Sequence, residues 1–122
     1  MMTRVLVVDD TDMLLRAIVR GLARLGFSVE GSSSPVKALE MLTFKKYDVV
    51  VSDYQMPEMN GDELCRKVRE AAPALPVILM SANLDVFKVA EECGAAIALL
   101  KPVTQNDVRD AIHKLIPPSP AP

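Results

Sequence analysis

Short apolar runs alternate with segments of helical periodicity along the whole chain, and this alternation constrains the fold more than any other feature. Each run is rich in Val, Ile or Leu, and between the runs apolar residues recur every three or four positions. The expected strands are residues 3–8, 27–31, 48–52, 75–80 and 96–100. The expected helices are residues 13–25, 35–42, 60–72, 83–93 and 104–116.

Residues typical of helix ends stand at the boundaries of these segments. Ser34, Asn60 and Thr104 are suited to N-cap positions, and Gly26 and Gly94 follow two of the helical segments. The helix boundaries are therefore marked by capping chemistry as well as by periodicity.

Strands that alternate with helices predict a parallel sheet, because parallel neighbours need a crossover connection between them. The apolar run 49–51 fits a central strand covered on both faces. We expect one doubly wound α/β domain over residues 1–116, with five helices on the two faces of a sheet of strand order 2-1-3-4-5. Residues 117–122 are proline-rich and form a tail or the start of a linker.

Net charge and the length of the apolar runs limit the kinds of partner that the chain is expected to bind. The formal net charge of −2 gives no field that gathers nucleic acid, so no direct nucleic-acid partner is expected. The apolar runs are far shorter than a membrane helix of about 20 residues. The first residues also differ from a signal peptide. We therefore expect a cytoplasmic protein without a membrane partner.

Polar residues follow the expected strands at the edge where such folds bind ligands. Asp9 and Asp10 end the first strand, Asp53 ends the third, Ser81 the fourth and Lys101 the fifth. In an open α/β sheet the ligand crevice lies beyond the carboxyl ends of the strands, where the strand order reverses. The three carboxylates are thus predicted to converge in one crevice.

Crowded carboxylates repel one another, and a hard divalent cation relieves that repulsion. Mg²⁺ suits such a pocket because it accepts a few carboxylate oxygens, keeps several waters and bridges to phosphate. A carboxylate beside Mg²⁺ and a lysine has the surroundings that phosphoryl transfer requires. The crevice therefore predicts phosphoryl chemistry.

Each of these residues also fits an ordinary structural role when taken alone. Asp9 and Asp10 suit helix capping, Asp53 suits a turn, Ser81 suits the N-cap of the fourth helix, and Lys101 suits a loop. Their common placement on one rim favours the functional interpretation.

The same residues resemble a known family, the receiver domains of two-component response regulators (CheY-like superfamily), which have a flavodoxin-like fold. The resemblance covers residues 3–116 and rests on Asp9-Asp10, Asp53, Met56-Pro57, Asn60-Gly61, Ser81-Ala82 and Lys101-Pro102. It implies that Asp53 accepts a phosphoryl group from the phosphohistidine of a kinase or phosphotransfer protein, or from a small phosphodonor. Ser81 and Lys101 would then contact the phosphoryl oxygens, and the Lys101-Pro102 peptide is often cis in this family.

The resemblance also implies a metal site and a site for the hydrolytic water. Asp10, Asp53 and the backbone carbonyl of Gln55 would ligate Mg²⁺, or Mn²⁺ as a substitute, with Asp9 acting through water. Gln55 and Asn83 resemble the family positions that tune dephosphorylation. Both are amides without a strong general base, so slow to intermediate autodephosphorylation is expected.

One position departs from the family pattern. Most receivers carry an aromatic residue three positions before the lysine, and this chain has Ala98 there. The coupling of Ser81 to the face of the fourth helix, fifth strand and fifth helix, a possible homodimer surface, is therefore in question. The signal would travel by loop or helix displacement, or through another face.

Three functions are compared at this stage. The favoured one is a phosphorylation-controlled signalling switch that is not an enzyme and changes its affinity for a downstream partner, either as a stand-alone receiver or as a module of a larger protein such as a hybrid kinase. An Mg²⁺-dependent phosphohydrolase of the haloacid-dehalogenase type needs a second acid where this chain has Gln55. A receiver that signals without phosphorylation predicts a damaged acid triad or lysine, and both are intact.

Overall fold

The computed structural model describes residues 2–118, and these form a five-stranded parallel sheet flanked by five helices. The strands are β1 (Arg4–Val8), β2 (Ser28–Ser32), β3 (Val49–Asp53), β4 (Val77–Ser81) and β5 (Ile97–Leu100). The helices are α1 (Asp12–Arg24), α2 (Pro35–Phe44), α3 (Gly61–Ala71), α4 (Val86–Cys93) and α5 (Gln105–Leu115). The predicted tail 117–122 lies largely outside the described residues.

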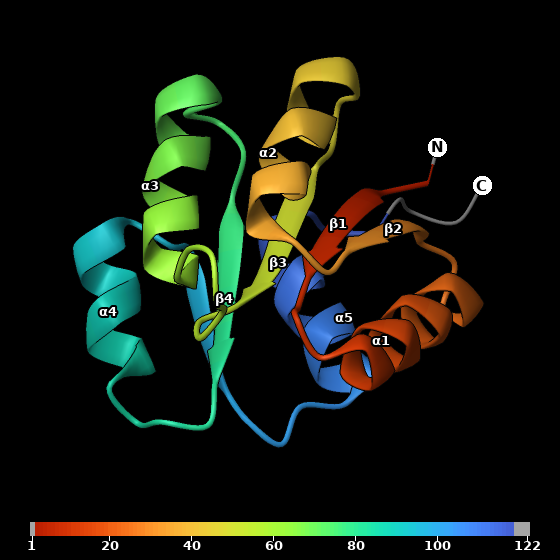
Figure 1. The fold of residues 1–122 in the computed structure, drawn as a ribbon. Helices are drawn as coiled ribbons and strands as arrows, with labels where there is room; N and C mark the ends of the chain where they lie inside the picture. The colour runs from red at the N-terminus through yellow and green to blue at the C-terminus, as the bar shows by residue number, and fades with distance from the viewer. Residues whose placement is uncertain (1, 119–122) are drawn as a thin grey trace.

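The strand order is β2-β1-β3-β4-β5, as predicted. Helices α1 and α5 lie together on one face of the sheet, and α2, α3 and α4 lie side by side on the other (Figure 1). The doubly wound architecture is therefore confirmed, with the order reversing between β1 and β3.

The core consists of two clusters, one on each face of the sheet, because successive residues of a strand point to opposite faces. In β1, Val5 and Val7 pack toward α1 and α5, whereas Leu6 and Val8 pack toward α2, α3 and α4. All five residues of β3 are buried, so the expectation of a central strand covered on both faces is confirmed.

Most predicted helix ends are confirmed by hydrogen bonds or backbone geometry. The Ser34 side chain accepts from the backbone amide of Lys37, and Thr104 forms a reciprocal capping box with Asp107. Gly94 ends α4 in the left-handed region, at a φ of 82°. The local sequence therefore encodes these helix ends directly.

One predicted start is correct in position but lacks its capping bond, and another is wrong. Asn60 is the N-cap residue of α3, but its side chain makes no capping bond and instead accepts from the amide of Met56 at 3.4 Å. Helix α4 begins at Val86 rather than at residue 83. The Ser81 side chain accepts a hydrogen bond from the amide of Asn83, and the Asn83 side chain accepts one from the amide of Asp85, so residues 82–85 form turns instead of helix.

Within residues 2–118, every helix is too short or too polar to cross a lipid bilayer.

Candidate functional site

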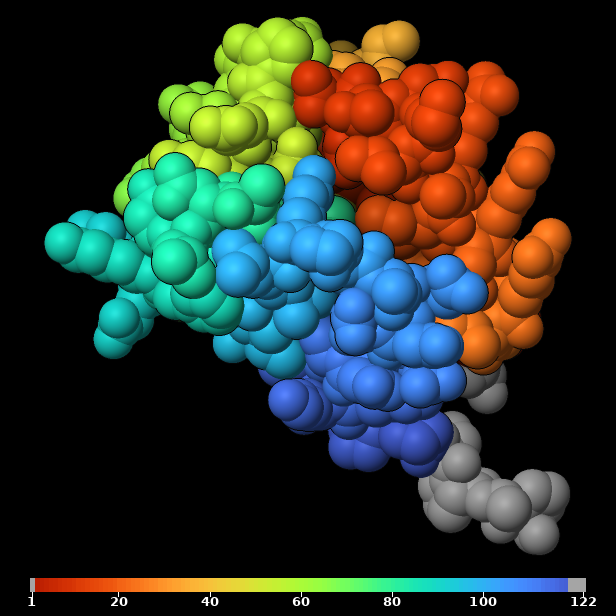
Figure 2. Space-filling view, turned by 90° about the horizontal axis from the view of Figure 1, so that it is seen from below, coloured from red at the N-terminus to blue at the C-terminus, as the bar shows by residue number. Residues whose placement is uncertain are grey.

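The three predicted aspartates meet where the sheet order reverses. Val8 of β1 lies opposite Ser52 of β3, so Asp9 and Asp53, one residue further on, come side by side. One carboxylate oxygen from each of Asp9, Asp10 and Asp53 lies within 4.8 Å of the others. Figure 2, which views this end of the molecule, shows the segments that follow the strands gathered around a hollow. The predicted convergence is therefore confirmed.

Asp9 is the most deeply placed acid of the cluster. Its side chain is fully buried, and its Oδ1 accepts from the backbone amide of Thr11 at 2.9 Å. Its Oδ2 has no hydrogen-bond partner within the described part of the chain. Burial raises the pKa of Asp9, and the charge of Asp53 raises it further. The capping alternative is wrong, because the N-cap residue of α1 is Thr11.

Lys101 supplies the positive charge of the cluster. Its Nζ lies 3.0 Å from Oδ1 of Asp53 and 3.8 Å from Oδ2 of Asp9. The backbone amide of Lys101 donates to the carbonyl of Ser81 at 2.8 Å, which fixes the end of β5 against the end of β4. The Lys101-Pro102 peptide is cis. One lysine therefore faces more than one carboxylate.

Ser81 ends β4 one position beyond Met80, the residue opposite Asp53. Its Oγ is buried and accepts from the amide of Asn83 at 3.1 Å, which leaves the hydroxyl hydrogen for an anion. The alternative role as the N-cap of α4 is wrong, because Asp85 occupies that position. Ser81 is thus placed on the rim beside the acids.

The loop after β3 places Gln55 beside the acid cluster. Asp10, Gln55 and Asn60 line one hollow together with Tyr54, Met56 and Pro57. Asn83 lies outside this hollow, and its Oδ1 accepts from the amide of Asp85 at 3.2 Å. The structure therefore brings Gln55, but not Asn83, into a shared hollow with an acid.

Gly61 is a residue of this region that periodicity does not single out. A Cβ at Gly61 would collide with the backbone carbonyl of Asp53. The first turn of α3 therefore approaches the end of β3 more closely than any residue with a side chain allows. The adjacent Asn60-Gly61 pair in the sequence was the available signal.

Ala98, which stands where most receivers have an aromatic residue, lies in β5 opposite Leu79 of β4. It is partly buried and packs against the core cluster beneath α3 and α4. The methyl group thus occupies a packed position in the sheet.

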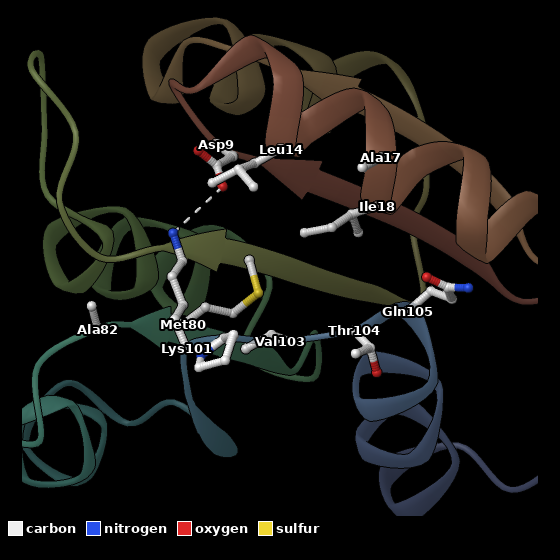
Figure 3. Close-up of a pocket in the computed structure, with 11 residues that line it drawn as sticks. Asp9, Leu14, Ala17, Ile18, Met80, Ala82, Lys101, Val103, Thr104 and Gln105 are labelled. Carbon is white, nitrogen blue, oxygen red and sulfur yellow. Dashed lines mark ion pairs between the residues drawn. The ribbon is translucent and has the colours of Figure 1, made fainter.

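An apolar hollow beside Lys101 was not predicted. It has a volume of about 470 Å³ and lies between α1 and the segment that joins β5 to α5. Figure 3 shows Lys101 and Asp9 pointing toward each other at one end and Leu14, Ile18 and Val103 lining the rest. Leu14 is 44% exposed at this hollow.

The donor set of the site fits a hard divalent cation. Three carboxylates lie together and Lys101 pairs with two of them, Asp9 and Asp53, while the buried Oδ2 of Asp9 lacks a hydrogen-bond donor among residues 2–118. A buried carboxylate oxygen without a hydrogen bond is costly, and a hydrated cation supplies further positive charge and water hydrogens. The cluster is thus suited to binding a metal and to stabilising the charge of a phosphoryl group.

Comparison with known proteins gives the class of protein. Residues 5–113 match the model of the response regulator receiver domain. A receiver-domain protein from Clostridium thermocellum superposes with a TM-score of 0.87 at 31% identity, covering 94% of each chain. A CheY-like protein from Methanospirillum hungatei gives 0.86 at 26% identity, also over 94% of each chain. The chain belongs to the response regulator receiver family, and the predicted membership is confirmed.

Curated relatives show how this domain occurs in longer proteins. The transcriptional regulatory protein CutR of Streptomyces coelicolor is 39% identical over 92% of this chain and 52% of its own length. The sensor protein EvgS of Escherichia coli is 31% identical over 91% of this chain but only 9% of its own length. The chain therefore spans about half of a regulator and a small part of a sensor protein.

Proposed function

We propose that Asp53 is the phosphoacceptor of this signalling domain. One observation carries the proposal: the Asp53 carboxylate ends the central strand, 3.0 Å from Lys101 and within 4.8 Å of two further acids. In the reaction an Asp53 oxygen bonds to phosphorus while the bond from phosphorus to the donor imidazole nitrogen breaks. The imidazole leaves with that electron pair.

Lys101 and Ser81 stabilise the transferred group. The Lys101 ammonium exchanges its contact with Asp53 for a phosphoryl oxygen, and the Ser81 hydroxyl donates to another. Asp10, Asp53 and the Gln55 carbonyl would hold Mg²⁺, or Mn²⁺ in its place, with Asp9 acting through water. When bound, the ion supplies positive charge next to the phosphoryl oxygens.

A histidine kinase or histidine phosphotransfer protein is the proposed donor. Its phosphohistidine must reach Asp53 from the solvent side of the rim, next to the apolar hollow lined by Leu14 and Val103. Apolar side chains beside the phosphohistidine would fit this hollow, whose lining is largely nonpolar, with Asp9 and Lys101 at one end and Thr104 and Gln105 further along. Because such a donor acts inside the cell, we assign the domain to the cytoplasm.

The output is a changed affinity for a downstream partner protein. Leu84 and Phe87 on the α4 side and Leu100 of β5 are exposed, so the α4–β5–α5 face offers apolar surface to a partner or a second copy. Ala98 leaves this face without the usual aromatic residue, so helix or loop displacement is the proposed route of coupling. Gln55 and Asn83, both amides, support slow autodephosphorylation.

A turnover enzyme is less well supported. A phosphohydrolase that uses a covalent aspartyl intermediate needs a general acid near the acceptor, and position 55 holds an exposed glutamine. Phosphate release from an excess of small phosphodonor distinguishes the two functions. We expect it to stay far below enzyme-like rates.

Intact mass spectrometry tests the proposal. The 122-residue chain is incubated with Mg²⁺ and acetyl phosphate, next to Asp53→Asn and to a sample containing EDTA. We expect a gain of one phosphoryl group in the wild type alone. No gain with rapid quenching, even with a phosphohistidine donor, would refute the assignment of Asp53.

A further inference from the structure

Helix α2 exposes two large apolar side chains beside its polar ones, unlike the usual helix that covers a sheet. Such helices present polar residues to solvent. Ala38 points into the core, but Val36 and Phe44 are 43% and 86% exposed. Phe44 is the most exposed of the large apolar side chains in the described residues. An exposed phenylalanine on an apolar helix marks a surface suited to association.

This surface is a groove rather than an isolated side chain. The residues that line it come from α2, from the loop before α3 and from α3 itself: Val36, Leu39, Glu40, Thr43, Phe44, Met59 and Lys67. Helices α2 and α3 lie next to each other on the same face of the sheet (Figure 1). We call this surface the α2–α3 groove.

The two charges of the α2–α3 groove match a second copy of the same groove. Glu40 stands near the middle of α2 and Lys67 near the middle of α3. Neither forms an ion pair within residues 2–118. Both helices run opposite to the parallel strands and so run in the same direction.

A two-fold axis along the groove therefore places Glu40 of one copy opposite Lys67 of the second, and Lys67 opposite Glu40. In this arrangement two ion pairs would form by symmetry, beside an apolar contact made of Val36, Leu39 and Phe44 from each copy. This self-complementarity favours a second copy of this chain, rather than an unrelated protein, as the partner that binds the groove.

The groove is also connected to the phosphoacceptor. Met59, which lines it, belongs to the loop that leads from Asp53 to Gly61. In the same loop, Glu58 Oε1 accepts from Oγ of Ser34, the N-cap residue of α2, at 2.6 Å. A shift of this loop changes the groove and the start of α2 together.

We propose that the α2–α3 groove is a self-association surface whose affinity changes when Asp53 is phosphorylated. The inference rests on the proposed function, because it takes phosphorylation of Asp53 as the input. It gives the domain an output face that does not require the aromatic residue missing at Ala98.

Sedimentation velocity tests this proposal over a concentration series of the full chain, with and without Mg²⁺ and acetyl phosphate. Intact mass is recorded on the same samples. We expect self-association with a dissociation constant that changes at least about threefold on phosphorylation. Phe44→Ser is expected to weaken it by about tenfold or more, because truncation of a large aromatic residue that becomes buried on association removes a large share of the binding energy.

A charge exchange provides the sharper test. Glu40→Lys and Lys67→Glu each place like charges opposite one another and weaken association, whereas the double variant restores it to within about threefold of the wild type. Phe87→Ser tests the α4–β5–α5 face instead, and Met13→Ser is the matched control, since Met13 is an 81% exposed apolar residue on α1, outside both surfaces. We expect Met13→Ser to leave the association unchanged.

The outcomes separate the two proposals. A phosphoryl gain without any change in association, or a dimer abolished by Phe87→Ser and insensitive to Phe44→Ser, overturns the groove and leaves the phosphoacceptor intact. Absence of a phosphoryl gain overturns the proposed function and the coupling with it. A chain that is monomeric in every state overturns the groove as well.

Discussion

The two ends of the β-sheet both carry clusters of charged side chains, and they differ in how these charges are paired. At the amino end of the strands, Arg4 binds Asp48 through its backbone amide at 2.8 Å and through its guanidinium, and Lys45 lies 3.0 Å from Glu30. Tyr47 adds a hydrogen bond to Glu30 at 2.9 Å. In this cluster each acid has a dedicated partner.

At the carboxyl end of the strands, three acids lie together, two of them share one lysine, and an oxygen of Asp9 has no hydrogen-bond partner within the described structure. The pKa directions follow the same division. Hydrogen bonds from Lys45 and Tyr47 lower the pKa of Glu30, whereas burial raises the pKa of Asp9. The amino end is thus an arrangement that stabilises the fold, and the carboxyl end is an arrangement that needs a ligand.

The largest difference between the ends is expected in phosphorylation itself. Lys101→Ala removes the cation beside Asp53 and should slow phosphorylation by acetyl phosphate by about a hundredfold or more, as for the loss of one preorganised donor. Lys45→Ala at the amino end is the control and should leave the rate unchanged. Equal rates for both variants, measured by quenched intact mass, would show that the lysine at the site has no special role.

The second largest difference between the two ends is expected in how metal binding changes stability. At a Mg²⁺ concentration of about 100 times its dissociation constant, the free energy of unfolding of the wild type should rise by about 2.7 kcal/mol. Asp53→Asn should lose most of this gain, whereas Glu30→Gln should keep it. Urea unfolding with Mg²⁺ and with EDTA gives the comparison, and a gain preserved in Asp53→Asn would contradict the assigned ligand set.

Neutralising one acid at each end should have opposite effects in metal-free buffer. Asp9→Asn keeps the acceptor for Thr11 and removes a buried charge, so stability should rise by about 1 kcal/mol. Asp48→Asn removes the charge that pairs with Arg4, so stability should fall by about 1 kcal/mol. Unfolding midpoints in urea show whether each variant is more or less stable than the wild type. A loss of stability in Asp9→Asn would contradict the conclusion that the buried Asp9 charge destabilises the metal-free fold.

The smallest expected effect is a pH dependence at the amino end. Burial and the hydrogen bond to Glu30 raise the pKa of Tyr47 to about 12, above its ordinary value of 10.0. A raised pKa in the folded state gives a stabilisation that is complete below pH 10 and lost as the pH rises through about 12. Tyr47→Phe should lack this alkaline loss in a pH series of unfolding, and an identical pH dependence in both proteins would count against the hydrogen bond.

Sequence patterns predicted those parts of the site that follow from the strand topology alone. Asp9, Asp53 and Lys101 each follow a strand, and a parallel sheet brings the carboxyl ends of its strands to one edge. The capping box at Thr104 was predictable for a similar reason, because all of its atoms lie within four residues.

Features that depend on competing local contacts could not be predicted. Asn60 caps nothing with its side chain because the Met56 amide is the donor it meets in the folded loop. The buried Asp9 oxygen without a hydrogen bond and the hollow beside Leu14 both result from the packing of segments that are distant in sequence. Periodicity carries no information about such packing.

The pairing of β1 directly with β3, described above from their register, has a consequence for the order of events during folding. Asp9 and Asp53 come together only after the intervening chain, with β2 and α2, has closed as a loop, and such closures between distant segments are slow. A newly made or partly folded chain therefore has aspartates but no acid cluster. Competence to receive a signal is acquired only with completion of the native sheet.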